Sequence, residues 1–186
     1  MTTSAGYHQE VEKALSNLKL SGRSHDHDNT KLKYVIYKLN RADDKFESVE
    51  GEMVTGSEYS LVIVDSTAKN TGFSSKDPSK RTNEETDNAN RKAYEQFVAL
   101  LPADECRWAL FNFVWVKDGG PRDKIIFISW SPDNSITKQK MAYASSKKAL
   151  CAKLQVEGLP MIFASDYDEI SYEIALKKVD PDTKMQ

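Results

Sequence analysis

The chain has 186 residues, of which 39% are hydrophobic, and its 26 Lys and Arg against 28 Asp and Glu give a formal charge of −2 at pH 7. This length and apolar content indicate a single folded domain over residues 1–186, and the near-neutral charge offers no overall basic field, so no nucleic-acid partner is expected. The sequence lacks a membrane-spanning run, a signal-peptide pattern and a C-x-x-C motif, so we expect a cytoplasmic protein with reduced cysteines.

The N-terminal third predicts one helix and up to three strands. Apolar residues at i, i+4 and i+7 indicate an amphipathic helix over residues 8–20, and they are Val11, Leu15 and Leu18. The polar residues 21–30 are typical of a loop. Three β-rich segments follow, at Lys33–Leu39, Phe46–Val54 and Tyr59–Asp65, of which the middle one is a weaker strand or one arm of a hairpin.

The middle of the chain predicts a long loop and then a helix. Residues 66–90 contain one aromatic residue among many Ser, Thr, Asn and Lys. Such a segment buries too little surface to offset its ordering entropy, so we expect a mobile insertion there. A helix follows from Glu84 or Asn90 to Leu101, and Pro102 ends it.

The C-terminal half predicts a strand pair followed by alternating helices and strands. A hairpin-like loop over Lys117–Asp123 joins the strands of the pair. In chain order the elements are the strands Arg107–Val116 and Lys124–Trp130, a helix over Ser135–Leu154, a strand over Met161–Ala164 and a helix over Asp168–Val179. The element order is therefore of the mixed α/β class.

The helix over residues 135–154 has an unusual outward face. At 100° per residue, one stripe must face the sheet, and it contains Ile136, Tyr143, Leu150 and Leu154. The opposite face gathers small residues and lysines around one methionine: Lys138, Met141, Ala142, Ser145, Lys148, Ala149 and Ala152. Small residues let a partner approach closely, methionine adapts to an apolar groove and lysines steer a charged partner. A protein-binding face explains this composition, and so does the helix propensity of Ala and Met alone.

Two motifs in this region resemble the signature of the actin-depolymerising factor/cofilin family. They are Ser129-Trp130-Ser131-Pro132-Asp133 and Lys138-Gln139-Lys140-Met141-Ala142-Tyr143-Ala144-Ser145-Ser146-Lys147. The resemblance extends to Leu101-Pro102, Cys106–Leu110, Lys124–Phe127 and residues 170–179, whereas residues 21–30 and 40–92 align poorly. It implies an ADF-homology domain with a central mixed five-stranded sheet flanked by helices on both faces, which agrees with the element order above.

The resemblance implies a protein without enzymatic activity or cofactor that binds actin monomers and filament sides and promotes severing and depolymerisation. The residues it implies for the monomer contact are Ser4, Gly6, Lys138, Lys140, Met141 and Ser145. Those it implies for the filament contact are Arg122, Lys124, Lys177 and Lys178. The helical angle of Lys140 places it beside the core stripe, so its role rests on the resemblance alone. Ser4 is also the candidate for an inhibitory phosphorylation, which would add about −1.5 to −2 charges beside a carboxylate-rich partner.

Other functions fit parts of the sequence. An ADF-homology relative such as glia maturation factor or a coactosin-like protein binds actin or an actin-nucleating complex without severing. A metal-dependent hydrolase would use His25 and His27, but ligands on one short loop rarely converge on an ion, so no metal site is expected. Basic pairs such as Lys147-Lys148 would attract phosphoinositide headgroups, which the resemblance also implies. We expect a monomer in which Cys106 and Cys151 are structural thiols.

Overall fold

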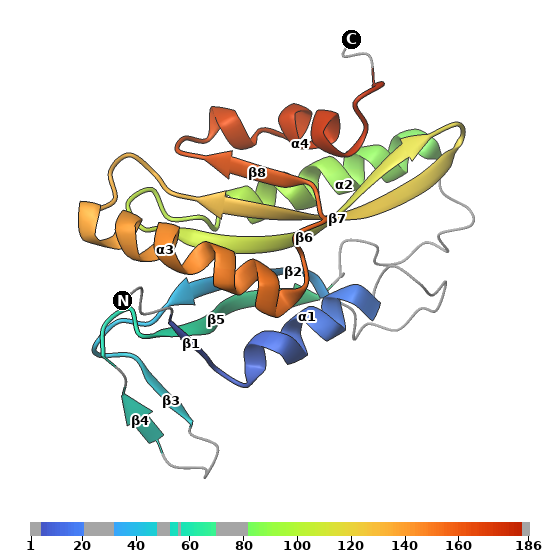
Figure 1. The fold of residues 1–186 in the computed structure, drawn as a ribbon. Helices are drawn as coiled ribbons and strands as arrows, with labels where there is room; N and C mark the ends of the chain where they lie inside the picture. Colours follow the sequence, from blue (N-terminus) through green and yellow to red (C-terminus); the bar gives the residue numbers. More distant parts are fainter. Residues whose placement is uncertain (1–4, 21–31, 48–52, 56, 70–81, 184–186) are drawn as a thin grey trace.

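The computed structural model describes residues 5–20, 32–47, 53–55, 57–69 and 82–183, and its main feature is a mixed sheet (Figure 1). The sheet has six strands in the order β1-β5-β2-β6-β7-β8. Their bounds are β1 Gly6–Tyr7, β2 Leu32–Leu39, β5 Leu61–Lys69, β6 Arg107–Lys117, β7 Gly120–Trp130 and β8 Met161–Ala164. The two edge strands run parallel to their neighbours, and the inner pairs are antiparallel.

The predicted mixed α/β class is confirmed, but the sheet has one strand more than the five expected. The additional strand is β1, which pairs in parallel with the start of β5. It spans only Gly6–Tyr7, so it is too short to show the alternation by which a strand is recognised in a sequence.

Helices cover both faces of the sheet, as the resemblance implied. They are α1 Glu10–Leu20, α2 Asn83–Val98, α3 Thr137–Leu154 and α4 Tyr172–Val179. Figure 1 shows α1 and α3 on one side of the sheet and α2 and α4 on the other. Successive residues of β6 point to opposite faces, so Leu110 packs in the core under α1 and α3, and Phe111 packs in the core under α2 and α4.

The long loop predicted at residues 66–90 is shorter than expected, because both of its ends belong to regular elements. Residues 66–69 continue β5, where Lys69 opposes Leu32 of β2. At the other end α2 already begins at Asn83, and Thr82 and Glu85 form a reciprocal capping box with two hydrogen bonds of 3.1 Å. Polar strand and cap residues therefore account for the loop-like composition at both ends. The remaining residues 70–81, and the loop predicted at 21–30, lie outside the described residues.

The hairpin between β6 and β7 is tighter than the loop predicted at Lys117–Asp123. The turn consists of Asp118 and Gly119, which have φ angles of 53° and 79°. Two left-handed residues at the turn match the right-handed twist of the strands they join. Residues 120–123 thus belong to β7, where the polar end of the hairpin extends beyond the hydrophobic core.

A separate two-stranded arm, β3 Lys45–Glu47 and β4 Met53–Thr55, lies between β2 and β5 in the chain. It projects away from the six-stranded sheet (Figure 1). The segment Phe46–Val54 was predicted as one strand or one hairpin arm, but its two ends belong to two short strands that pair with each other. The last predicted helix is divided in two, because Ser171 is extended between the short helix η3 Asp168–Ile170 and α4.

Candidate protein-binding face

Helix α3 is fixed to the sheet by both apolar and polar contacts. Tyr143, Leu150 and Leu154 are buried, as the helical stripe predicts. The ring centroids of Tyr143 and Trp108 are 4.4 Å apart, and the Tyr143 hydroxyl accepts a 2.9 Å hydrogen bond from the Leu39 N–H. Ile136 was assigned to the same stripe, but its side chain is 62% exposed. It is the N-cap residue and has an extended backbone, so the helical angle does not apply to it.

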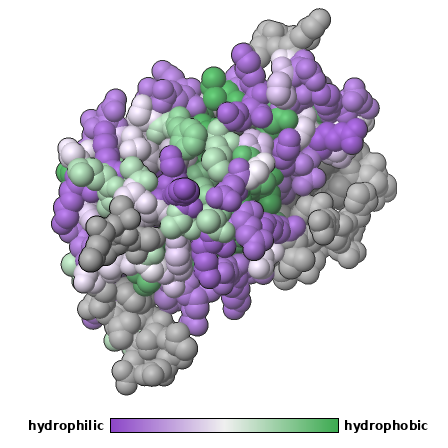
Figure 2. Space-filling model, viewed as in Figure 1, coloured by the Kyte–Doolittle hydropathy of each residue, from purple (hydrophilic) through white to green (hydrophobic). Residues whose placement is uncertain are grey.

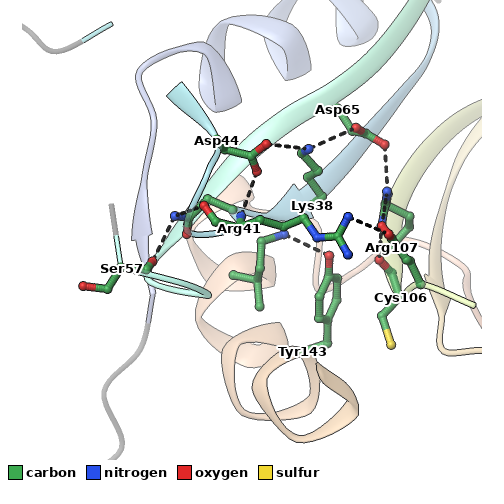
Figure 3. Close-up of polar contacts among 11 residues, drawn as sticks. Lys38, Arg41, Asp44, Ser57, Asp65, Cys106, Arg107 and Tyr143 are labelled. Carbon is green, nitrogen blue, oxygen red and sulfur yellow. Dashed lines mark hydrogen bonds and ion pairs between the residues drawn. The ribbon is translucent and has the colours of Figure 1, made fainter. Parts of the chain in front are cut away.

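A polar network beside Tyr143 ties together the strands beneath the start of α3 (Figure 3). Arg107 is buried and forms ion pairs of 2.8 Å with Asp65 and with Glu105. Lys38 bridges Asp65, at 3.8 Å, and Asp44, at 3.2 Å. Burial opposes the charge of Arg107, but the hydrogen bonds from its guanidinium to these carboxylates leave its pKa raised. The network joins β2, β5 and β6, and it therefore fixes the strands on which the start of α3 packs.

The outward side of α3 carries three of the predicted residues together. Lys138, Met141 and Ser145 are all exposed, with Met141 at 68%, and we call them the α3 face. They lie at i, i+3 and i+7, so they form one stripe along the helix. In the space-filling view, pale and green residues run through the middle of this side of the molecule, with purple residues around them (Figure 2).

Lys138 is already engaged within the protein. Its ammonium lies 2.6 Å from a carboxylate oxygen of Glu58 and 5.5 Å from the ring centroid of Tyr59. The hydrogen bond to Glu58 is the main cause of a raised pKa at Lys138, and the same bond lowers the pKa of Glu58. No local sequence pattern points to either partner, because the Lys138–Glu58 contact joins residues 80 positions apart in the chain.

Lys140 lies on a different flank of α3, which agrees with its helical angle. Its ammonium reaches the Asp133 carbonyl at 3.2 Å and the Asp133 carboxylate at 3.7 Å. The side chain lines a groove of about 410 Å³ between α3 and β8, together with Lys147 and Phe163. Phe163 is 57% exposed, and the Lys147 ammonium lies 4.3 Å from its ring centroid. The structure therefore separates Lys140 from the α3 face.

The N-terminal candidates are only partly described. Gly6 pairs with β5, and its N–H donates a 2.8 Å hydrogen bond to the Ser60 carbonyl, next to Glu58 and Tyr59. A Cβ at Gly6 would lie 3.2 Å from a methyl carbon of Leu61, so the close pairing favours glycine. Ser4 lies outside the described residues, as do His25 and His27. Within the described part of the chain, no group of three or more His, Cys, Asp and Glu could hold a metal ion.

The four cations predicted for the filament contact are exposed on the opposite side of the sheet. Arg122 opposes Trp115 and Lys124 opposes Phe113 in the β6–β7 ladder, and opposed residues of antiparallel strands point to the same face. Phe113 and Trp115 pack in the core under α2 and α4. Lys177 and Lys178 lie in the last turn of α4.

The end of the hairpin and the end of α4 are joined directly. The Lys117 ammonium lies 2.6 Å from the carboxylate of the buried Asp180, which follows α4, and this contact lowers the pKa of Asp180. The ring centroids of Phe113 and Tyr172 are 5.1 Å apart, so the start of α4 also packs on strand β6 of the hairpin. The two elements that carry these cations thus lie side by side. We call the set the hairpin–α4 surface: Arg122, Lys124, Lys177 and Lys178.

Comparison with known proteins identifies the fold and the family. Residues 56–180 match the family model described as Cofilin/tropomyosin-type actin-binding protein. The chain belongs to this family. It is 38% identical over 141 residues to a cofilin of Mycosarcoma maydis, covering 75% of this chain and 91% of that protein. It is 45% identical over 85 residues to actin-depolymerizing factor 1 of Oryza sativa subsp. japonica, covering 45% of this chain and 60% of that protein.

Solved structures agree with membership of the cofilin family. The crystal structure of Streptomyces griseoflavus cofilin aligns with a TM-score of 0.63 at 28% identity, covering 96% of this chain and 98% of that chain. The α3 face and the hairpin–α4 surface both lie within the matched residues 56–180, whereas the β3–β4 arm precedes them. No helix in the described part of the chain is long and apolar enough to cross a membrane.

Proposed function

We propose that this member of the cofilin family binds actin monomers and the sides of filaments and promotes filament severing and depolymerisation. The observation that carries the proposal is the α3 face, an exposed stripe of a lysine, a methionine and a serine on a helix that is fixed to the core. It lies within the residues that match the family of actin-binding proteins. The activity needs no covalent chemistry and no cofactor.

The monomer contact is assigned to the α3 face, and Lys140, Gly6 and Ser4 are assigned to the same contact. Met141 is 68% exposed, and burying a methionine side chain against an apolar groove contributes roughly 1.5 to 3 kcal/mol. A lysine ammonium only donates hydrogen bonds, so Lys138 and Lys140 require carboxylate or carbonyl oxygens on the partner. Phosphorylation of Ser4 would place negative charge near these oxygens and weaken binding.

The filament contact is assigned to the hairpin–α4 surface. This surface lies on the α2 and α4 side of the sheet, whereas the α3 face lies on the other side, so the two can engage neighbouring actin subunits. A ligand that binds one subunit arrangement better than another shifts the filament toward that arrangement. Contacts that depend on the original arrangement are then weakened, which favours breakage.

The remaining expectations about partners are part of the same proposal. The protein acts as a monomer in the cytoplasm, and phosphoinositide headgroups compete with actin for its basic residues. The alternative is an ADF-homology relative that binds actin without severing. The structure of coactosin from Entamoeba histolytica is similar, with a TM-score of 0.60, but at 14% identity this similarity supports only the shared fold.

A sedimentation assay with actin filaments tests the function. Increasing amounts of the protein are incubated with filaments, and actin and the protein are quantified in pellet and supernatant. Severing and depolymerisation predict actin moving into the supernatant and shorter filaments under the microscope. Stable decoration, with all actin remaining in the pellet and filament length unchanged, would favour the alternative. Absence of this protein from the pellet, together with unchanged actin, would contradict filament binding.

A further inference from the structure

The buried residue Asn40 anchors the loop at the base of the β3–β4 arm. Asn40 has no exposed surface, and its carboxamide binds the Ser57 carbonyl at 2.9 Å and the Leu61 N–H at 2.8 Å. The backbone carbonyl of Asn40 accepts a 2.8 Å hydrogen bond from the Tyr59 N–H. Tyr59 itself has a φ angle of 61°, a left-handed conformation that a bulky residue adopts only when its surroundings enforce it. These hydrogen bonds therefore give loop 57–61 a defined backbone conformation.

This loop presents its side chains to the α3 face. Glu58 lies 2.6 Å from the Lys138 ammonium, while the Tyr59 ring lies beneath it at 5.5 Å. The pair is open to solvent, with the Lys138 side chain 70% exposed and that of Glu58 38% exposed. A partner approaching the α3 face therefore meets a lysine whose charge is already matched by a carboxylate of the same chain.

We propose that Glu58 is an intramolecular competitor for Lys138, which it holds in the free protein and releases when actin docks on the α3 face. The inference rests on the proposed function, because it concerns the same surface. Lys138 can only donate, so its acceptors on actin and the Glu58 carboxylate draw on the same ammonium. The anchored loop holds the Glu58 backbone beside α3, so the competing carboxylate is within reach of Lys138 in the free protein.

The size of the effect follows from the exposure of the pair. Exposed ion pairs are weak, and breaking one changes an equilibrium by about twofold to fivefold. Glu58→Gln keeps the size of the side chain and removes its charge, so it should tighten binding to actin monomers by about that factor. Glu58 thus tunes affinity at the α3 face from a loop outside the helix, through its contact with Lys138.

The test is a double-mutant cycle with a matched control on the same helix. Monomer affinity is measured by fluorescence of labelled actin for the unmodified protein, Glu58→Gln, Lys138→Met and the double variant. Glu12→Gln is the control, because Glu12 pairs with Lys153 of α3 at 2.8 Å, about 22 Å along the helix from Lys138. We expect tighter binding by Glu58→Gln, no such gain in the Lys138→Met background and no change in Glu12→Gln.

Each contrary result has a distinct meaning. Unchanged or weaker binding by Glu58→Gln would overturn the competition, and so would an equal gain in the Lys138→Met background, since that would be a general charge effect. If the unmodified protein bound no actin, the proposed function itself would fail, which is separate from a binding protein that ignores Glu58→Gln. Circular dichroism confirms that each variant is folded.

Discussion

Lys33 gives the structure its clearest dependence of stability on pH. The side chain lies in β2 and is 5% exposed, with its ammonium 3.4 Å from the Asn90 carboxamide oxygen and 5.1 Å from the Phe111 ring centroid. Burial lowers the pKa of Lys33 from 10.5 to about 7, and the negative charge of Asp123 opposes this change only partly. The amine is thus about half neutral at pH 7, although an exposed lysine is fully charged there.

The sign of the effect follows from proton binding in the two states. Between about pH 7 and 10.5 the unfolded chain holds a proton on Lys33 that the folded protein has lost, so stability rises with pH across this window. Below pH 7 both states are protonated, and the cost of the buried charge is fully present. At about 1.4 kcal/mol per pKa unit, the whole interval corresponds to about 5 kcal/mol, and raising the pH from 7 to 9 corresponds to about 2 kcal/mol.

Lys33→Met removes the charge and keeps a long flexible side chain. We expect the variant to be more stable than the unmodified protein by several kcal/mol at pH 6.5, with a difference that shrinks by about 3 kcal/mol by pH 9. Urea unfolding followed by circular dichroism at several pH values measures both quantities. Lys92→Met, at an exposed position of α2, is the control and should leave the profile unchanged. Parallel profiles for Lys33→Met and the unmodified protein would refute a buried, partly neutral lysine.

The remaining predictions concern actin binding and residues 70–81. Lys138→Ala with Lys140→Ala should weaken monomer binding by about 2 kcal/mol or more per desolvated contact while circular dichroism stays unchanged; undiminished affinity would disprove the assignment. Ser4→Glu should reduce affinity for monomers and Ser4→Ala should not, as titration of labelled actin would reveal. Replacing residues 70–81 by a short Gly-Ser linker should barely alter the melting temperature, and a large fall would mean that they pack. Neutralising the hairpin–α4 surface should abolish co-sedimentation with filaments but spare monomer binding, and raised salt should mimic it.

The sequence predicted best those elements whose pattern is local. The stripe of Tyr143, Leu150 and Leu154 was correct because one helix covers one face of the sheet along its length. The prediction was wrong at Ile136, one residue before the helix, where the periodicity no longer applies. The same limit explains residues 66–69, whose mostly polar composition hid the continuation of β5. Their backbone pairs with β2, which composition does not report.

The candidate site required contacts that no local pattern contains. The motif on α3 indicated Lys138, but its engagement by Glu58 joins segments 80 positions apart in the chain. Likewise, the Lys117 to Asp180 ion pair, which joins the hairpin to α4, spans 63 positions between two exposed-looking polar segments. Periodicity places a residue on a face of its own element, and only the packing of elements decides which charged groups meet.

The arrangement of the two surfaces bears on how binding could be converted into severing. The sheet stands between the α3 face and the hairpin–α4 surface, so contact with a single monomer can use the first and leave the second free. On the proposed function, both contacts form together in a filament only if neighbouring subunits adopt the spacing that this chain imposes. To take a rare subunit arrangement from 1% to 99% of the population, a ligand must prefer it about 10⁴-fold, or about 5.5 kcal/mol. Exposed cations supply roughly 0 to 1 kcal/mol each, so the hairpin–α4 surface alone falls short of that figure. On the proposed function, several bound molecules acting on adjacent subunits must select the arrangement together. We therefore predict that severing rises steeply with protein concentration while monomer binding stays hyperbolic.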